Sequence, residues 1–198
     1  MFKTIFKEHI YPAVLAGMAI SIAALCNLKE HPYVGALLFV FGLSTVVSMN
    51  WKLFTGAVGF FDHKNFPLLL PTLLFNIIGA GLTALVGFHM TGELSAAADV
   101  IVTNRLSASL TAILLTSMLC GFIMTVSVGN AKSKNWLPLI VGIPLFVVSG
   151  FPHCVADITY YVLSGYNLNE CVVPWTISMF GNAIGGNIPT LCRWIKKN

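Results

Sequence analysis

An interruption in an apolar segment decides the fold of this chain, and it reads Ser149-Gly150-Phe151-Pro152-His153-Cys154-Val155-Ala156-Asp157. Glycine, proline and two ionisable side chains stand there between the apolar residues 141–148 and 158–163. Non-helical backbone at membrane depth is tolerated only where it is buried in protein or lines a cavity. An ionisable residue at such a break is a candidate for a substrate path, so His153 is the first functional hypothesis.

Composition places this segment in a membrane. Only 9% of the 198 residues are charged and 57% are hydrophobic, with a mean hydropathy of +0.84, whereas a soluble domain usually carries about 25% charged residues. We therefore expect an all-α polytopic protein that forms a single transmembrane domain over residues 1–198 in the lipid bilayer. The net charge of +4 indicates orientation in that bilayer rather than a nucleic-acid surface.

Six apolar segments are candidates for membrane spans, each of which needs about 20 residues. The first has no small-residue cleavage site, so we expect it to be retained rather than removed as a signal peptide. Polar connections separate the segments, two of them expected at 99–105 and 167–170. The predicted spans cover residues 10–28, 34–51 with a continuation at 56–61, 66–90, 107–129, 136–150 with a continuation at 155–166, and 172–195.

The basic residues predict the orientation, because cytoplasmic loops carry an excess of Lys and Arg. With both termini in the cytoplasm, only Lys29 and Arg105 fall in outside loops, while Lys52 falls inside the second span. We therefore expect a multi-pass protein of the inner (plasma) membrane with cytoplasmic N- and C-termini. The residues assigned to the inside are Lys3, Lys7, Lys64, Lys132, Lys134, Arg193, Lys196 and Lys197.

Two of the predicted spans, the second and the fifth, are interrupted. The run Val46-Val47-Ser48 precedes the first interruption and Val147-Val148-Ser149 precedes the other, which places Lys52 opposite His153. Each set of three spans then has its broken helix in the middle, so halves at roughly 9–90 and 107–195 form an inverted repeat. Broken helices at corresponding positions of inverted halves indicate a substrate path at the membrane midplane.

Charges at the two breaks suggest a further contact. A lone charge at membrane depth is costly, so Lys52 and Asp157 are a candidate charge pair across the breaks. The alternative is that Lys52 extends along its helix end towards the membrane surface.

The sequence gives no support to an enzyme, a metal or a cofactor. Its five cysteines include no C-x-x-C spacing, and no His-Glu-x-x-His or Gly-x-Ser-x-Gly motif occurs. The cysteines fit small buried hydrophobic residues. We therefore expect no catalytic residue, no metal ligand and no cofactor.

Three motifs together resemble the formate/nitrite transporter family of anion channels, and the likeness covers nearly the whole chain. Leu53-Phe54-Thr55-Gly56 matches the family's element in the broken second helix, and Gly181-Asn182-Ala183-Ile184-Gly185-Gly186 matches its element in the sixth. The stretch 149–157 matches the element in the fifth helix. The resemblance implies a pentamer of aquaporin-like protomers, each with its own pore.

The resemblance also implies a role for individual residues. Without it, a histidine here could be structural, an arginine could face outwards, and a phenylalanine could be packed in the core or face lipid. It implies that His153 is the central pore histidine, Phe39 and Phe146 are aromatic constrictions, Leu43 narrows the same region, Leu53, Phe54 and Thr55 form the opposing loop, Arg105 supplies an entrance charge, and Asn182 is a polar partner from the sixth helix.

We expect a channel or transporter for small monovalent anions such as formate, nitrite or hydrosulfide. Crossing as a neutral acid after protonation near His153 is one hypothesis, because protonating a carboxylate at pH 7 costs about 4 kcal/mol. A channel for a neutral solute such as urea is the alternative. Four residues depart from the family pattern, namely Lys52, Gly121, Pro152 and Asp157, and we expect selectivity to depend on the pair that flanks His153.

Overall fold

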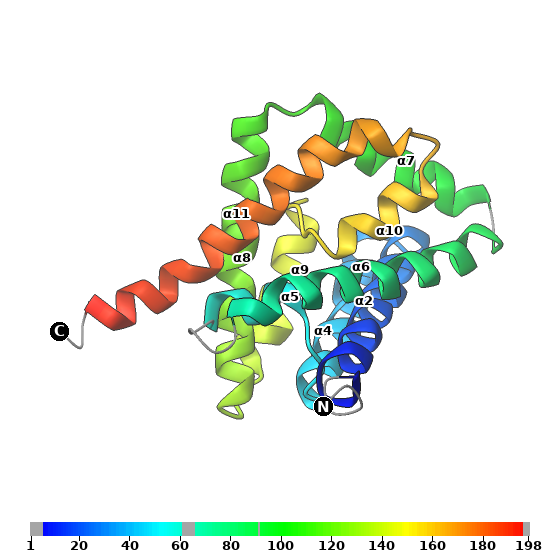
Figure 1. Ribbon diagram of the computed structural model, residues 1–198. Coiled ribbons are helices and arrows are strands. Elements are labelled where there is room, and N and C mark those ends of the chain that lie inside the picture. Colours follow the sequence, from blue (N-terminus) through cyan, green and yellow to red (C-terminus); the bar gives the residue numbers. More distant parts are fainter. Residues whose placement is uncertain (1–5, 61–65, 91, 196–198) are drawn as a thin grey trace.

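The computed structural model of the chain describes residues 6–60, 66–90 and 92–195, except for the side chains of residues 6, 7, 193 and 194. Helices and their connections make up all of these residues (Figure 1). The elements are η1 Phe6–Ile10, α2 Tyr11–Lys29, α3 Pro32–Leu38, α4 Val40–Ser48, α5 Phe54–Ala57, η2 Val58–Phe60, α6 Phe66–Phe88, α7 Gly92–Ser107, α8 Leu110–Lys132, α9 Leu137–Val148, α10 Ala156–Leu163 and α11 Leu168–Ile195.

The prediction of an all-α membrane fold with broken second and fifth helices is confirmed. Three helical segments, Glu8–Lys29, Phe66–Phe88 and Leu110–Lys132, are long and apolar enough to cross a membrane. The shorter apolar segments Pro32–Ser48 and Leu137–Val148 end at the two interruptions. Four of the basic residues used to predict orientation, Lys3, Lys64, Lys196 and Lys197, lie outside the described residues.

Two predicted connections are wrong. Residues 99–105 belong to α7, and residues 168–170 form the first turn of α11. The run Ser95-Ala96-Ala97-Ala98 favours a helix, and α7 packs on α10 although it is too polar to resemble a span. Helix propensity and tertiary contacts therefore outweigh the polar composition from which these loops were predicted.

Both interrupted helices end in the same left-handed turn. Asn50 has φ 53° and Gly150 has φ 67°, a conformation that glycine and asparagine adopt most readily. The next residue closes the turn in each case, because the Trp51 N–H donates to the Val46 carbonyl at 2.9 Å and the Phe151 N–H donates to the Phe146 carbonyl at 3.0 Å.

The matched turns correct the predicted register between the halves. Because Asn50 corresponds to Gly150, Lys52 corresponds to Pro152 and Leu53 to His153. The shared Val-Val-Ser runs are displaced by one residue from this alignment, so the prediction that Lys52 stands opposite His153 is wrong.

An asparagine from the third span holds the second break. The Asn76 side chain is fully buried, and its amide donates to the carbonyls of Ala13 and Lys52 at 2.7 and 2.8 Å. Its carbonyl oxygen accepts the Phe54 N–H at 2.8 Å. The bonds to Lys52 and Phe54 satisfy backbone groups that the interruption would otherwise leave unpaired in a dry interior, while the bond to Ala13 ties the break to α2.

An asparagine from the sixth span holds the fifth break in the same way. The Asn182 amide donates to the carbonyls of Ser117 and Pro152, both at 2.9 Å, and its carbonyl oxygen accepts the Cys154 N–H at 2.9 Å. Each partner of Asn182 occupies the position in the second half that the corresponding partner of Asn76 occupies in the first. This repeated network is a direct structural expression of the inverted repeat.

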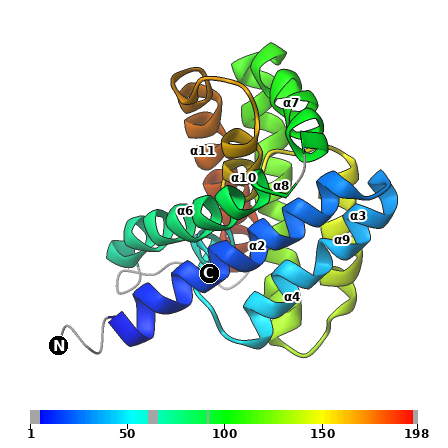
Figure 2. The ribbon, with the colours of Figure 1, turned by 90° about the vertical axis from the view of Figure 1, so that its right-hand side faces the viewer.

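Glycines bring the long helices of each half into close contact. A Cβ added at Gly17 of α2 would overlap the backbone of Asn76, and one added at Gly121 of α8 would overlap the backbone of Asn182. Figures 1 and 2 show the resulting crossings, α2 with α6 and α8 with α11. Gly121 therefore has a packing role in this chain.

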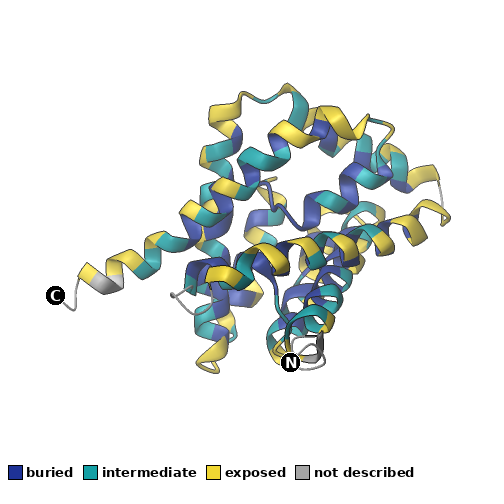
Figure 3. Ribbon diagram, in the orientation of Figure 1, coloured by how far each residue is buried: buried dark blue, intermediate teal, exposed yellow. Residues whose placement is uncertain are grey.

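The outer faces of the long helices are apolar and exposed, as Figure 3 shows for the ribbon around a buried centre. Leu70, Leu82 and Val86 of α6 and Leu115 of α8 are each more than half exposed. Such faces suit lipid or a neighbouring subunit. The buried polar residues gather instead around the two breaks.

Candidate functional site

Two cavities adjoin the breaks, and each is lined from one of them. The lysine cavity, of about 200 Å³, is lined by residues that include His9, Leu43, Trp51, Lys52, Leu53 and Lys132. The arginine cavity, of about 310 Å³, is lined by residues that include Phe39, Arg105, Phe146, Gly150, His153 and Asp157. The second break thus contributes to the first cavity and the fifth break to the other.

Apolar side chains stand where the two cavities approach the centre. Phe39 and Phe146 meet edge to face, with ring centroids 5.8 Å apart, and are 2% and 3% exposed. Leu43 lies four residues beyond Phe39, hence on the same side of the helix, and lines the lysine cavity with Leu53. Phe39 and Phe146 line the arginine cavity, so the predicted constriction residues and Leu53 of the predicted loop are divided between the two cavities.

A hydrogen bond joins the two breaks at this level. The Oγ1 atom of Thr55 and the Nε2 atom of His153 are 2.8 Å apart, and both side chains are buried. The Ala156 N–H donates to Nδ1 of His153 at 3.1 Å. Because Nδ1 accepts, the neutral imidazole carries its proton on Nε2 and donates it to Thr55.

Aromatic packing fixes the ring of His153. Phe146 stacks on it with centroids 5.7 Å apart and planes inclined by 24°. The imidazole is therefore held by one ring face and by both of its nitrogens. Phe54, the other predicted loop residue, is buried beside Thr55 and lines neither cavity.

Arg105 is the ion-pair partner of Asp157. Its Nε lies 3.5 Å from Oδ2 of Asp157, and its Nη1 donates to the Gly150 carbonyl at 2.6 Å. The predicted pair of Lys52 with Asp157 is wrong, because Lys52 lines the other cavity. The sequence prediction missed that α7 continues to Arg105 and presents this residue to the fifth break.

The ion pair with Asp157 weakens the positive field that Arg105 was expected to supply at the entrance. Arg105 lines the arginine cavity, but a carboxylate at 3.5 Å offsets its field there. Its contacts with Gly150 and Asp157 also connect the two ends of the fifth break. In the structure Arg105 is therefore a support for the segment that carries His153.

Two asparagines complete the site from behind. Asn182 was predicted to be a polar partner in the path. It lines neither cavity, and its side-chain amide forms hydrogen bonds with backbone groups. Asn76 was not predicted. Its signal is present in the sequence, since Asn76-Ile77-Ile78-Gly79 repeats the pattern Asn182-Ala183-Ile184-Gly185.

The described residues contain no group of three or more His, Cys, Asp or Glu side chains that could hold a metal ion. Ser117, Thr125 and Ser178 have buried hydroxyl groups without a hydrogen-bond partner in this part of the chain. They are dispersed among the helices. The chemistry of the site therefore rests on hydrogen bonding by Thr55 and His153, and on charge in the two cavities.

Comparison with known proteins identifies the family to which this chain belongs. The sequence profile of the formate/nitrite transporter family matches residues 3–195. The chain belongs to the formate/nitrite transporter family. It is accordingly a multi-pass membrane protein that transports small anions, as the motifs predicted, and the members of its family are transporters and channels rather than enzymes.

Solved structures share this fold at low identity. A pentameric formate channel with formate bound has a TM-score of 0.81 and 20% identity, over 98% of each chain. An ion channel of the formate/nitrite transporter family has a TM-score of 0.81 and 20% identity, over 94% of this chain and 88% of that one. Comparison of the sequence with curated proteins finds no match.

Proposed function

We propose that the protein conducts small monovalent anions of the formate type between the two cavities, past the Thr55–His153 hydrogen bond. That bond is the observation that carries the proposal, because it supplies the polar contact at the apolar junction of the two breaks. A bare anion crosses such a junction only at a large desolvation cost. A donor at this point offsets part of that cost.

His153 acts as a hydrogen-bond donor in this proposal. Its Nδ1 is occupied by the Ala156 N–H, so the proton on Nε2 is the one it presents, first to Thr55 and then to the anion. A neutral imidazole does not give that proton away. The proton that converts a carboxylate into a neutral acid therefore comes from water in the cavity, at a cost of about 4 kcal/mol at pH 7.

Transport would be proton-coupled under this mechanism. The protonated fraction of a carboxylic acid with a pKa near 4 rises about tenfold for each unit by which the pH falls. Formate uptake should rise accordingly between pH 8 and pH 5. A channel for urea would show no such rise, since urea does not titrate in this range.

The assembly and orientation also belong to the proposal. The exposed apolar faces of α6 and α8 suit contact with copies of the chain, and a related structure is a pentamer, so we infer a homopentamer. The lysine cavity, lined by His9 and Lys132, would open to the cytoplasm. Both termini would then be cytoplasmic in the inner (plasma) membrane.

The test is uptake of labelled formate and labelled urea into proteoliposomes across a pH series. The wild type should take up formate faster than urea, with the rise towards low pH described above. His153→Phe keeps an aromatic ring but removes both nitrogens, and should lower formate uptake at least about tenfold, the effect of losing one charge-assisted hydrogen bond.

His89→Phe is the matched control, because His89 is exposed after the end of α6 and lines neither cavity. It should leave uptake unchanged. Wild-type formate uptake and pH response in His153→Phe would contradict the assignment of His153. Equal uptake of urea and formate at every pH would contradict an anion transporter.

A further inference from the structure

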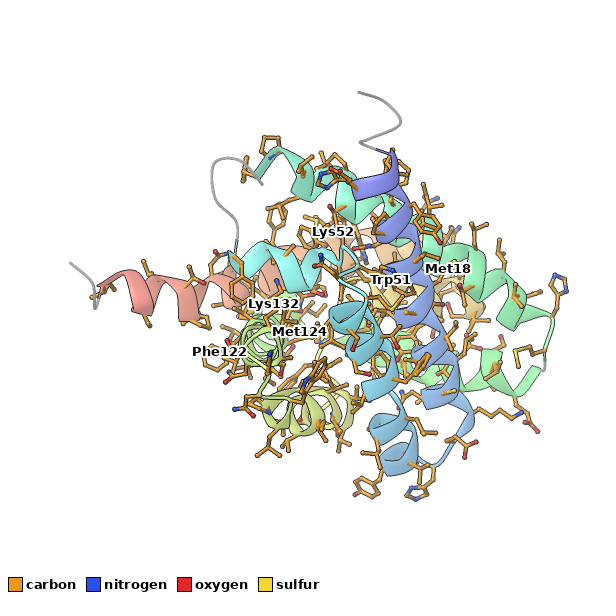
Figure 4. All side chains as sticks on the ribbon, turned by 90° about the horizontal axis from the view of Figure 1, so that it is seen from below. Met18, Trp51, Lys52, Phe122, Met124 and Lys132 are labelled. Atoms are coloured by element: carbon orange, nitrogen blue, oxygen red, sulfur yellow. The ribbon has the colours of Figure 1, made fainter. Side chains whose placement is uncertain are left out.

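The lysine cavity holds two basic side chains that have no acidic partner among the described residues. Lys52 comes from the second break and Lys132 is the last residue of α8, yet both line this one cavity of about 200 Å³. Figure 4 shows them on the same face of the molecule, on separate elements. None of the described residues that line the cavity is Asp or Glu, and Glu8, beside His9, is exposed and not part of the lining.

The backbone and a neighbouring ring fix where the two lysines stand. The Lys52 N–H donates to the Pro12 carbonyl at 3.4 Å, and its own carbonyl accepts from Asn76. The ammonium group of Lys132 lies 5.0 Å from the centroid of the Phe60 ring, which is a cation–π contact. Neither ammonium forms an ion pair within the described part of the chain.

Two like charges that share a cavity repel each other, and an anion between them removes the repulsion. A monovalent anion offsets one charge, while a dianion offsets both. We propose that the lysine cavity is a binding site for an anion of the phosphate class, held between Lys52 and Lys132. Inorganic phosphate and phosphate monoesters present this chemistry at neutral pH.

Other groups of the cavity suit such a ligand. The Trp51 indole lines the cavity beside Lys52, and Asn50 is exposed at the turn before it. Neither side chain forms a hydrogen bond within the described residues, so each keeps an N–H donor for an oxygen atom. The cavity is open to the solvent at Lys132, which is exposed.

The inner end of the cavity excludes a dianion from the path. Leu43 and Leu53 close it with apolar side chains that are 1% and 2% exposed. The cost of removing an ion from water rises with the square of its charge, so a dianion is stopped where a monovalent anion can be protonated and proceed. A bound phosphate would therefore obstruct entry from this side, and this consequence rests on the proposed transport.

Binding is tested first, without transport, on the full-length protein in detergent. Inorganic phosphate should raise the unfolding temperature above that in chloride at equal ionic strength, because a ligand of the folded state stabilises it. Lys52→Met and Lys132→Met should each weaken the apparent affinity about tenfold, the usual effect of losing one charged contact. Lys134→Met is the control, since Lys134 is exposed near the same end of α8 and does not line the cavity.

Inhibition is tested next in proteoliposomes. Phosphate on the side of the lysine cavity should slow formate uptake by the wild type and by Lys134→Met, and should do so about tenfold less potently in the two cavity variants. Vesicles of phosphatidylcholine with and without phosphatidic acid distinguish a lipid phosphate group from soluble phosphate as the ligand. If adding phosphatidic acid abolishes the inhibition by soluble phosphate, the site binds a lipid phosphate group. If the inhibition remains, the site binds soluble phosphate.

The two proposals fail separately. Phosphate-specific stabilisation that requires both lysines, in a protein without formate uptake, would leave this site intact and contradict the transport. Normal formate uptake in a protein that phosphate neither stabilises nor inhibits would overturn the site. Equal stabilisation in wild type and in Lys52→Met/Lys132→Met would also overturn it, because the effect would then be the general stabilisation of folded proteins by phosphate salts.

Discussion

The break after Asn50 and the break after Gly150 share one backbone conformation but carry side chains of different chemistry. Both turns are left-handed, both are closed by the following N–H, and both are held by a buried asparagine with three hydrogen bonds. Their side chains differ at every position that matters for charge. Lys52 and Leu53 stand in the second break where Pro152 and His153 stand in the fifth.

The difference shows which features of the repeat are structural. Unpaired backbone groups cost the same in either half, so the asparagines that satisfy them occur in both. Under the proposed transport, the side chains that contact a solute need not be the same in both halves. The two cavities therefore differ in charge: two lysines line one of them without an ion pair among the described residues, and an arginine paired with Asp157 lines the other.

The largest expected effect tests the shared scaffold. Asn76→Leu and Asn182→Leu each leave one N–H and one carbonyl of a break without their partner, at about 1–3 kcal/mol for each group, and also remove a bond to a neighbouring helix. Both variants should lose several kcal/mol of folding stability and yield little folded protein. The measurement is recovery of detergent-stable protein, followed by thermal unfolding.

Asn130→Leu is the control for that pair. Asn130 is a helical asparagine too, but it is only partly buried, and among the described residues its amide donates to Val126 alone, in its own helix, at 2.9 Å. Its loss should cost less than about 1 kcal/mol. If Asn76→Leu behaved like Asn130→Leu while Asn182→Leu failed to fold, the equivalence of the two breaks would be refuted.

The next effect tests where the halves differ. Asp157→Ala leaves the charge of Arg105 in a place where only 13% of its side chain is exposed, and breaking such a pair costs about 3 kcal/mol or more. Arg105→Met/Asp157→Ala should lose less stability than the two single changes added together, by about 1–3 kcal/mol. Thermal unfolding of the four proteins measures this coupling.

Lys52 provides the comparison for that cycle. Because Lys52 lines the other cavity, Lys52→Met and Asp157→Ala should be additive within about 0.5 kcal/mol. A coupling between Lys52 and Asp157 as large as that of Arg105 would restore the pairing inferred from the sequence and contradict the ion pair described above.

The sequence predicts the fold because its strongest signals are local. Gly150, Pro152 and His153 in an apolar run mark a break without knowledge of any partner. The predicted Lys52–Asp157 pair was wrong for a different reason, because it depended on which residues of distant segments face each other. A chance Val-Val-Ser match shifted the alignment of the two halves by one residue. Arg105 was placed in a loop, since hydropathy does not reveal a polar helix such as α7.

The roles of the buried asparagines needed the structure. A sequence shows that Asn182 lies in an apolar segment, where a polar side chain is a candidate for contact with a solute. Only the structure shows that its amide bonds to backbone groups with both of its polar atoms. Asn76 could have been found from the repeated Asn-x-Ile-Gly spacing, had the halves been compared through their third and sixth helices.

The smallest expected effect concerns the glycines behind the breaks. Gly17→Ala and Gly121→Ala each place a methyl group against the backbone of an asparagine on a neighbouring helix. Backbone cannot move aside as a side chain can, so both changes should cost about 1–3 kcal/mol through overpacking. Gly81→Ala is the control, because a Cβ there meets no atom within 4 Å, and alanine should stabilise the helix by up to about 1 kcal/mol. Thermal unfolding of the three variants would show equal losses at Gly17 and Gly121 if the two halves share one scaffold. A loss at only one of them would mean that one half packs more loosely behind its break, and the divergence would then extend from the side chains to the backbone.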